Sequence, residues 1–533
     1  MGRATETLIS FGISSGAAFG TVFRHRISAP HFDTAFGSRP ANVSGMFFVQ
    51  NMCSFQIRRQ NALDTFCRSC YTPVPVGRSP RHEEFFEEFF MVFKLRKTPV
   101  SPLQPIPPRW FAGLSLSNDA SRIDAALVGV HGQGSGAPIE IRKTISFDLP
   151  GEIVSLYDEV LEAVSGEDFG ETSVATYRDG FPRPLAMEKR YRLTREMSQI
   201  VEEAFHELSA DSQLPATEIM AVGINDPGIR NFTSLGQRFE SLCDPDYFAR
   251  NTGMNTIDAF PVRDIAAGGQ GGPVFSFPTW VLLKSDGKDR ILLDLGKAAK
   301  LTWIPKTSRL TAAREIDYQD IVPCGLLLDA LTYQLTKGET SIDQGGRLTV
   351  QGRHLPELLE QWRELAVNEP VWSPYGPSPA PYLQLTLGHA ESAWSVRDIL
   401  CSASYLIVDE VVDAVLEYIG KARRNTADVE ILLCGGARQH GFLLNRLSTR
   451  LTDNPITPIS RVGIPEEAFD ALCTAVLAMM FVDQIPSNLP HLTGSETSVP
   501  LGRLTPGNPV AWQRLLQSMA SAKPVQRTLR SAM

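Results

Sequence analysis

Three glycine-rich segments constrain more than any other feature what this chain can fold into. They are the segments 113–124 (GLSLSNDASRID), 264–273 (DIAAGGQGGP) and 434–441 (CGGARQHG). The first leads directly into an apolar run, and the third lies between a predicted strand and a predicted helix. Glycine lets backbone N–H groups approach an anion without interference from a side chain, and a following helix N-terminus adds a favourable dipole. One such segment is commonly just a turn, but three in this order predict a cleft that binds phosphate groups.

The apolar periodicity of the chain predicts strands and helices in alternation. Short buried runs and alternating patterns indicate strands, and apolar residues at helical spacing indicate helices. The predicted strands are 123–130, 139–147, 218–224, 280–284, 290–296 and 429–437, and the predicted helices are 152–164, 195–208, 325–335, 399–422 and 465–484. The glycine-rich segment 131–136 (HGQGSG) is expected to be a hairpin tip. Strands open each half and strand–helix alternation follows, which predicts two α/β lobes.

Residues 1–108 differ from the rest of the chain. Nine arginines and only three acidic residues precede residue 82, and the segment 82–90 (HEEFFEEFF) can place paired aromatics on one helix face. The proline-rich stretch 99–108 cannot continue a helix and predicts an extended linker. A poorly ordered extension, or a start site assigned too early, is preferred here over a transit peptide. The expected organisation is therefore an extension (1–108), lobe I (109–245), lobe II (246–508) and a C-terminal tail (509–533).

Composition excludes several partners and locations. The 533 residues are 43% hydrophobic and 21% charged, with a formal net charge of -8. A net negative chain lacks the basic footprint that nucleic-acid binding requires. No apolar run reaches the roughly 20 residues of a membrane span. Most of the eight cysteines lie in apolar runs, as reduced core residues of a cytoplasmic protein do. Cys67 and Cys70 have the spacing of half a zinc site, but no second pair follows at a suitable distance.

The motifs from residue 110 to residue 508 resemble those of the anhydro-N-acetylmuramic acid kinases, which belong to the actin and sugar-kinase superfamily. The most specific stretches are DIAAGGQGGP (264–273) and PSNLPHLTGS (486–495). LDLGKAAKLT (293–302), YQDIVPCGLLLDAL (318–331), LLCGGARQHGFLLNRL (432–447) and GIPEEAFDALCTAVLA (463–478) also match the family, in the right order and spacing. The resemblance implies two RNase-H-like lobes with a nucleotide cleft between them, and a homodimer.

The resemblance also implies an activity and a site. The expected activity is the ATP- and Mg²⁺-dependent phosphorylation of 1,6-anhydro-N-acetylmuramic acid with opening of its anhydro ring, in peptidoglycan recycling. Asp264 is the expected general base, a role that suits a carboxylate. The expected nucleotide contacts are Ser117, Asn118, Asp119, Ser121, Arg122, Asp124, Gly296, Lys297, Gly435 and Gly436. The expected sugar contacts are Asn225, Asp226, Gly268, Gly269, Gln270 and Asp470. No metal ligand is predicted. Without the resemblance, Asp264 would be interpreted as a helix cap or turn residue.

Several positions depart from the family pattern. Ser121 and Arg122 stand where the family has an Asp-Gly pair, and Asn225 stands where it has a histidine. In the second phosphate loop Lys297 and Lys300 replace a glycine and an asparagine. These lysines could bind phosphate as point charges or simply be solvated. Two alternatives therefore stay open beside the kinase: a kinase of another carbohydrate, and a pseudokinase or sugar-binding regulator with the same fold. A dinucleotide-binding dehydrogenase is disfavoured because no G-x-G-x-x-G follows a strand with an acidic residue about 20 positions on.

Overall fold

The computed structural model describes residues 107–165, 184–233, 236–307, 312–368, 372–373, 376–388, 394–421 and 428–522. All described residues belong to the compact unit Val100–Met533. The predicted helix face at 82–90, the Cys67–Cys70 pair and most of the proline-rich stretch lie outside the described residues. Within the described ranges, none of the helices combines the length and apolar character that a bilayer crossing requires.

The first sheet has six strands in the order β15-β7-β4-β1-β2-β3. Its strands are β1 (Arg109–Leu116), β2 (Arg122–Val130), β3 (Ile139–Asp148), β4 (Ile219–Asn225), β7 (Thr256–Asp258) and β15 (Arg503–Thr505). The first three pair antiparallel, and β4 and β7 then add in parallel beside β1. The predicted hairpin tip at 131–136 does join two strands, β2 and β3.

The second sheet has five strands in the order β10-β9-β8-β13-β14. They are β8 (Asp289–Leu295), β9 (Ala298–Ile304), β10 (Asp317–Pro323), β13 (Val429–Cys434) and β14 (Ile456–Pro458). Again three strands form an antiparallel meander, and two parallel strands follow. The same strand arrangement therefore occurs twice, which confirms the predicted fold of two related α/β lobes.

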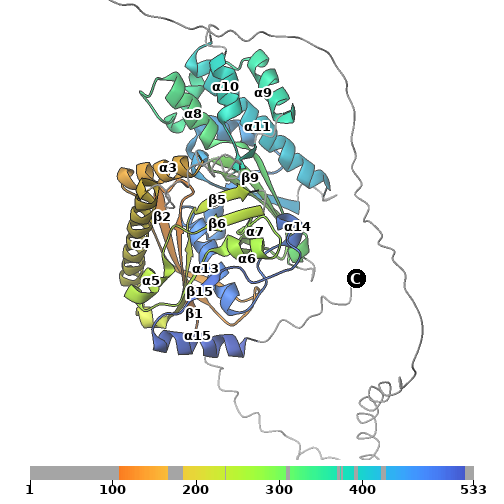
Figure 1. Ribbon diagram of the computed structural model, residues 1–533. Coiled ribbons are helices and arrows are strands. Elements are labelled where there is room, and N and C mark those ends of the chain that lie inside the picture. Colours follow the sequence, from red (N-terminus) through yellow and green to blue (C-terminus); the bar gives the residue numbers. More distant parts are fainter. Residues whose placement is uncertain are drawn as a thin grey trace, which may run out of the picture. The chain divides into compact units, whose positions relative to one another are not determined.

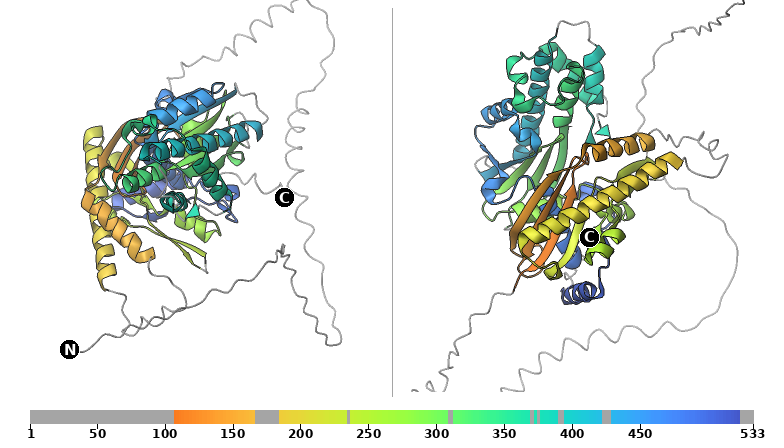
Figure 2. Two further views of the ribbon diagram at one scale, coloured as in Figure 1. Left: turned by 90° about the horizontal axis from the view of Figure 1, so that it is seen from above. Right: turned by 90° about the vertical axis from the view of Figure 1, so that its left-hand side faces the viewer.

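Helices cover both faces of the first sheet because its strands are apolar on both sides. Phe111 and Val128 pack with α13 (Phe469–Val482) in one cluster. Leu114 and Leu127 pack in another with α3 (Gly151–Ser165) and α4 (Pro184–Ser212), which lie against the opposite face in Figures 1 and 2. The approach of α13 is close: a Cβ on Gly113 would lie 2.0 Å from the carbonyl oxygen of Ala471. The glycine in β1 is thus required by helix packing.

Helices accompany the second sheet, and those labelled α8, α9, α10 and α11 lie in the upper part of Figure 1. The helices that accompany this sheet are α8 (Gly325–Leu335), α9 (Pro356–Asn368), α10 (Ala380–Gly388), α11 (Val396–Lys421) and α12 (Gly441–Arg450). Leu293, Leu301 and Leu433 point into the core that these helices form. Leu292 and Leu432, on the opposite face of their strands, join the cluster of α13 instead. The second sheet therefore turns one face toward α13.

The remaining helices and strands contact both sheets and α13. They are β5 (Ile229–Thr233), β6 (Gly236–Glu240), α5 (Pro245–Thr252), α6 (Phe260–Ala266), α7 (Ser276–Leu283), β11 (Trp372–Ser373), β12 (Gly376–Pro377), α14 (Pro490–Thr493) and α15 (Pro509–Ser521). α15 packs on β4, and the Asn255 side chain donates to the carbonyl of Ala511 at 2.9 Å. The segment predicted to be a tail thus begins with a docked helix.

One prediction of secondary structure was wrong in type, and another differs from the structure at its first residues. The segment 280–284 was expected to be a strand, yet residues Ser276–Leu283 form helix α7. A short apolar run buried on all sides has no periodicity that separates a strand from a helix, and nearly all of α7 is buried. The helix expected from Pro465 begins four residues later, at Phe469.

The boundary expected between residues 245 and 246 does not coincide with the division between the sheets. β7 and β15 both follow that boundary in sequence, yet both belong to the first sheet. α13 also packs on β1, β2 and β4. The reason is that strand pairing and helix packing bring late segments of the chain back to the first lobe, which local sequence patterns do not encode.

Candidate functional site

The first glycine-rich segment is a tight turn rather than a long loop. Residues 113–116 belong to β1 and residues 122–124 to β2, so only residues 117–121 form the turn. Asp119 Oδ1 accepts hydrogen bonds from Ser117 Oγ at 2.6 Å and from Ser121 Oγ at 2.7 Å. The backbone N–H groups of Ser121 and Arg122 both donate to Ser117 Oγ at 3.1 Å. The predicted nucleotide contacts of this turn therefore lie together, but they bind one another.

The second turn joins β8 to β9 and faces the first one. Lys297 lies 2.8 Å from Asp119, measured between Nζ and Oδ2. Asp119 comes from the first lobe and Lys297 from the second, so the ion pair joins the two predicted phosphate loops across the lobes. Among the other predicted nucleotide contacts, Asn118 is exposed and its carbonyl accepts a hydrogen bond from the Tyr157 hydroxyl at 3.3 Å.

The third turn lies directly against the second. Gly435 has a φ of +94°, and a Cβ on it would lie 2.4 Å from Asp294 Oδ1 and 2.6 Å from the backbone N of Gly296. Only glycine satisfies both the dihedral and the contact. Gly436 has open space at its Cβ position. The structure therefore brings the expected nucleotide contacts Gly296, Gly435 and Gly436 together, and their binding roles stay predictions.

A row of polar side chains crosses the second sheet on the face turned toward α13. Lys300 on β9 is directly opposite Asp294 on β8 and directly opposite Asp320 on β10. Cys434 on β13 is in turn paired with Asp294, and the Tyr318 hydroxyl donates to Asp320 at 2.7 Å. Directly opposed residues share one face of a sheet, so the five groups form one row. Sequence reasoning singled out Lys300 but not the row as a whole, although alternation within each strand could have indicated it.

The charges of this row act on one another. Burial lowers the pKa of Lys300, but Asp294, Asp320 and Asp470 together raise it above its usual value. Burial and the neighbouring Asp320 raise the pKa of Asp294, against the effect of Lys300. Among the described residues, no carboxylate oxygen lies within 4.0 Å of the ammonium. The carboxylates therefore act on the Lys300 ammonium by longer-range Coulomb attraction rather than by a direct ion pair.

Asp470 connects this row to the first lobe. It lies in the first turn of α13 and its side chain is exposed, yet burial and the nearby Asp294 raise its pKa to about 6. Arg122, which also acts on Asp470, pairs with Asp124 at 2.7 Å and donates to the carbonyl of Glu467 at 3.0 Å. Arg122 and Asp124 thus take part in the polar contacts between the start of β2 and the residues that precede α13.

Asp264 is the most completely enclosed of the predicted site residues. It lies in the last turn of α6 with no exposed surface. Its Oδ2 accepts a hydrogen bond from the backbone N of Gly271 at 2.8 Å, and its Oδ1 accepts one from Asn488 Nδ2 at 2.9 Å. A Cβ on Gly269 would lie 2.2 Å from Oδ2. The glycines after α6 therefore let the backbone wrap tightly around this carboxylate.

The PSNLPHLTGS stretch holds the glycine-rich loop in place, a role that sequence reasoning missed. Asn488 is buried and its Oδ1 also accepts from the backbone N of Val499 at 2.7 Å. The backbone N of Gln270 donates to the carbonyl of Thr493 at 2.9 Å, while the Gln270 side chain is exposed. Gly268 is beside Glu496. The specificity of this stretch was the signal that could have found Asn488.

Asp226, one of the expected sugar contacts, has a structural role. Asp226 is buried and accepts hydrogen bonds from Ser241 Oγ at 2.5 Å and from the backbone N of Cys243 at 2.9 Å. Burial raises the pKa of Asp226. Asn225, at the end of β4, donates to Ser115 Oγ at 3.1 Å. Asp226 therefore anchors the loop that precedes α5, and Asn225 ties the ends of β4 and β1 together.

The described residues do not provide a ready site for a divalent metal ion. No group of three or more His, Cys, Asp or Glu side chains in the described ranges is arranged to hold one. The charges of Asp294, Asp320 and Asp470 instead raise the pKa of the Lys300 ammonium. Magnesium requires several oxygen ligands at short, regular distances. Kinase sites usually hold Mg²⁺ through one or two carboxylates together with the substrate phosphates and waters, so the use of Mg²⁺ with ATP stays a prediction.

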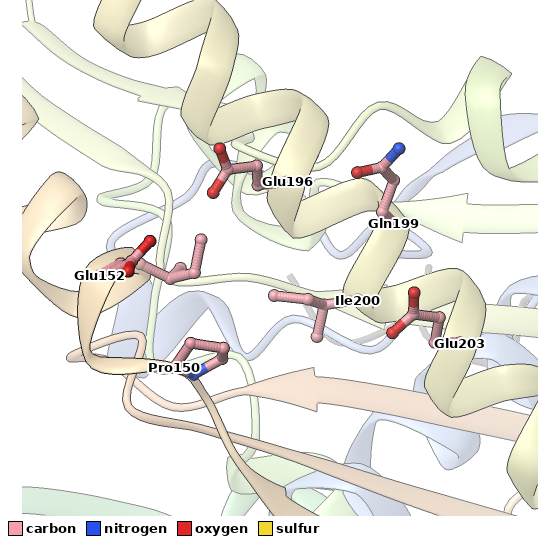
Figure 3. A pocket seen from close by; sticks show the side chains of 7 residues that line it. Pro150, Glu152, Glu196, Gln199, Ile200 and Glu203 are labelled. Atoms are coloured by element: carbon pink, nitrogen blue, oxygen red, sulfur yellow. The ribbon is translucent and has the colours of Figure 1, made fainter.

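A pocket of about 220 Å³ lies elsewhere, between the start of α3 and the middle of α4. Figure 3 shows Glu152 from α3 facing Glu196 and Glu203 from α4, with Ile200 between them. None of its lining residues is a predicted site residue. The pocket is therefore separate from the groups described above.

Comparisons with known proteins agree with the motifs. The family model described as anhydro-N-acetylmuramic acid kinase matches residues 179–507. The anhydro-N-acetylmuramic acid kinase of Synechocystis sp. is 26% identical over 402 residues, which cover 73% of this chain and 97% of that protein. That of Gloeobacter violaceus is 30% identical over 275 residues, which cover 50% and 68% respectively. A solved ROK-family glucokinase from Streptomyces griseus covers 69% of this chain and 98% of its own, at 10% identity and a TM-score of 0.30. The chain belongs to the anhydro-N-acetylmuramic acid kinase family and is a carbohydrate kinase.

Proposed function

We propose that this kinase phosphorylates 1,6-anhydro-N-acetylmuramic acid with ATP and opens the anhydro ring hydrolytically. The products are N-acetylmuramic acid 6-phosphate and ADP. The observation that carries the proposal is the Asp264 carboxylate, which two N–H donors hold within the segment DIAAGGQGGP. A carboxylate oriented in this way suits a general base. A place in peptidoglycan recycling, a cytoplasmic location and a homodimer remain predictions.

The proposed reaction uses one water and one ATP. Asp264 removes a proton from the water, and the water oxygen forms a bond to the anomeric carbon while the bond from that carbon to O6 breaks. The freed O6 then attacks the γ-phosphorus of ATP, and the bond to the β-phosphate oxygen breaks to release ADP. Asp264 passes its proton to solvent at the end of the cycle. Every bond formed is thus matched by one broken.

Water must reach Asp264 for this reaction to occur. The carboxylate has no exposed surface, and residues 268–271 enclose it. Each carboxylate oxygen has a second lone pair that the described hydrogen bonds leave unused. A displacement of the glycine-rich loop would admit a water without breaking the bond from Asn488. Closure of the same loop would then exclude further water, which competes as a phosphoryl acceptor.

The three turns are the proposed nucleotide site. Gly435 and Gly436 would accept the adenosine, with Gly436 open at its Cβ position. The turn 117–121 and Lys297 would face the phosphates, and a lysine ammonium stabilises the charge that develops on a transferring phosphoryl group. The ion pair between Lys297 and Asp119 joins Lys297 to the turn 117–121, so one triphosphate could contact both.

The test is direct. Purified protein is incubated with ATP, Mg²⁺ and 1,6-anhydro-N-acetylmuramic acid, and mass spectrometry detects a phosphorylated sugar. The control is Asp264→Asn. An asparagine can offer an oxygen to Gly271 but then presents its NH₂ group to Asn488, so a stability loss of about 1–2 kcal/mol is expected. The thermal midpoint of both proteins is therefore measured first, and activity is compared well below both midpoints.

Product from the parent and none from Asp264→Asn supports the proposal. A second candidate is a sugar-binding protein that has lost phosphoryl transfer, which the self-satisfied hydrogen bonds of the turn 117–121 favour. Binding of the sugar without product from any member of a carbohydrate panel would support that candidate. Product from a different sugar would keep the kinase and change its substrate.

A further inference from the structure

The turn between β1 and β2 contains a negatively charged group, the carboxylate of Asp119. Asp119 Oδ1 accepts hydrogen bonds from Ser117 Oγ at 2.6 Å, from Ser121 Oγ at 2.7 Å and from the backbone N of Ser121 at 3.2 Å. Asp119 Oδ2 receives the Lys297 ammonium at 2.8 Å. One carboxylate thus binds two hydroxyls, a backbone amide and a lysine. These are the groups with which proteins bind a phosphate oxygen.

Asp119 is ionised in this position. Burial raises the pKa of its carboxyl, but the hydrogen bonds from Lys297, Ser117 and Ser121 outweigh that effect and hold the pKa well below its usual value. The charge of Lys297 is therefore already balanced before any ligand arrives. The backbone N–H of Arg122 also has a partner within the turn, because it donates to Ser117 Oγ at 3.1 Å.

We propose that Asp119 occupies the first phosphate loop as an internal competitor of the nucleotide, so that a phosphate binds Lys297 and the turn only after this carboxylate leaves. The inference rests on the proposed nucleotide site, and it makes Asp119 a determinant of nucleotide affinity. Asp119 is not a catalytic residue, because its carboxylate occupies the place of a phosphate and does not contact the reacting atoms.

The contact is suited to displacement. The side chains of Lys297 and Asp119 are 44% and 31% exposed, and ion pairs this accessible to water contribute little net stability. A triphosphate carries more negative charge than one carboxylate and can bind the lysine and the turn together. The pair is therefore a weak, reversible occupant that lowers affinity without abolishing binding.

Asp158 on α3 provides a matched control. It is exposed, and the charges of both Lys297 and Asp119 act on it, so it lies in the same electrostatic field. It donates or accepts nothing within the turn. Asp158→Asn removes one negative charge beside the loop without emptying it, whereas Asp119→Ser removes the charge and empties the loop.

The experiment is calorimetric titration of the full chain with ADP and, separately, with inorganic tripolyphosphate. The expected result is that Asp119→Ser binds both probes about tenfold more tightly than the parent, while Asp158→Asn changes affinity by less than about twofold. Lys297→Met should weaken binding in the parent and remove most of the gain in the Asp119→Ser background. If Asp119→Ser does not fold, Asp119→Asn, which keeps the size and an acceptor oxygen, is expected to change affinity in the same direction.

Several results would overturn the inference. Equal gains in Asp119→Ser and Asp158→Asn would show a general charge effect rather than occupancy of the loop. Weaker binding in Asp119→Ser would show that the carboxylate helps the nucleotide to bind. No binding of either probe by any variant would remove the nucleotide from this loop. The binding assay contains no sugar, so each of these results is independent of the product assay that tests the kinase reaction.

Discussion

Asn488 Nδ2 lies 2.9 Å from Asp264 Oδ1, and the two residues are 224 positions apart in sequence. The bond ties the stretch PSNLPHLTGS to the proposed general base. Both side chains are buried, so neither can exchange its partner for bulk water without local opening. A residue that orients a base from this distance in sequence is a positioning residue, and its removal should change the reaction more than it changes substrate binding.

Asn488→Ala should lower kcat by about 10- to 100-fold with little change in the KM for ATP, because Asp264 loses one of its two donors. Stability should fall by about 1–3 kcal/mol, since Val499 also loses its acceptor. Steady-state kinetics and urea unfolding check both values. The control is Asn445→Ala on the exposed side of α12, which should leave both unchanged. An unaltered kcat in Asn488→Ala would separate Asn488 from the base.

Gly269→Ala should inactivate the enzyme, because a Cβ at this position would lie 2.2 Å from Asp264 Oδ2. The carboxylate or the loop must move to relieve the clash, at a cost of about 1–3 kcal/mol. The matched variant is Gly272→Ala in the same loop, where the nearest atom is the backbone N of Val274 at 3.8 Å. Product formation by the two variants is compared. Full activity in Gly269→Ala would mean that the tight wrapping around Asp264 is dispensable.

Lys300→Met should destabilise the protein by about 1–3 kcal/mol at pH 8, because Asp294 and Asp320 lose the positive charge between them. The loss should shrink toward pH 5. The pKa of Asp294 is raised in the folded protein, and removing the ammonium raises it further, so the folded state takes up protons as the pH falls and regains stability. Urea unfolding at both pH values measures this change.

Two controls accompany the Lys300 variant. Lys300→Arg keeps the charge and should lose less stability, while Lys288→Met removes an exposed lysine from the loop before β8 and should be neutral. A stability loss in Lys300→Met that is the same at pH 5 and pH 8 would mean that the lysine stem, rather than its charge, stabilises the row.

Asp470→Asn should raise stability at neutral pH by roughly 0.5–1 kcal/mol, a small value because solvent screens this exposed carboxylate. The pKa of Asp470 is raised from 3.8 to about 6 in the folded protein. Its contribution to stability is therefore fully present below about pH 4 and is lost as the pH rises to about 6. Thermal unfolding from pH 4 to pH 7 should show a flatter profile in the variant than in the parent. An identical profile would contradict the raised pKa.

The glycine turns show which features of a turn can be predicted from local sequence and which cannot. The segment VEILLCGGA predicted a strand that ends in a glycine turn, and β13 followed by Gly435 and Gly436 has that form. The first glycine-rich segment spans residues 113–124, but strand pairing leaves a turn of only five of them, residues 117–121. Turn residues are recognisable locally, but the length of a turn depends on how far the flanking strands pair.

The two-lobed fold and the family were predictable from the sequence, because apolar periodicity and short motifs are local properties of the chain, whereas the role of Asp264 as general base stays a prediction. α7 was not predictable, because a buried apolar run carries no period. The tertiary structure alone decided that Asp119 faces Lys297, that Asn488 binds Asp264, and that Lys300 stands between Asp294 and Asp320. Each of these relationships depends on strand register or on packing between segments distant in sequence. Side-chain charge and hydrogen bonding act over a few ångströms in space, whatever the separation along the chain.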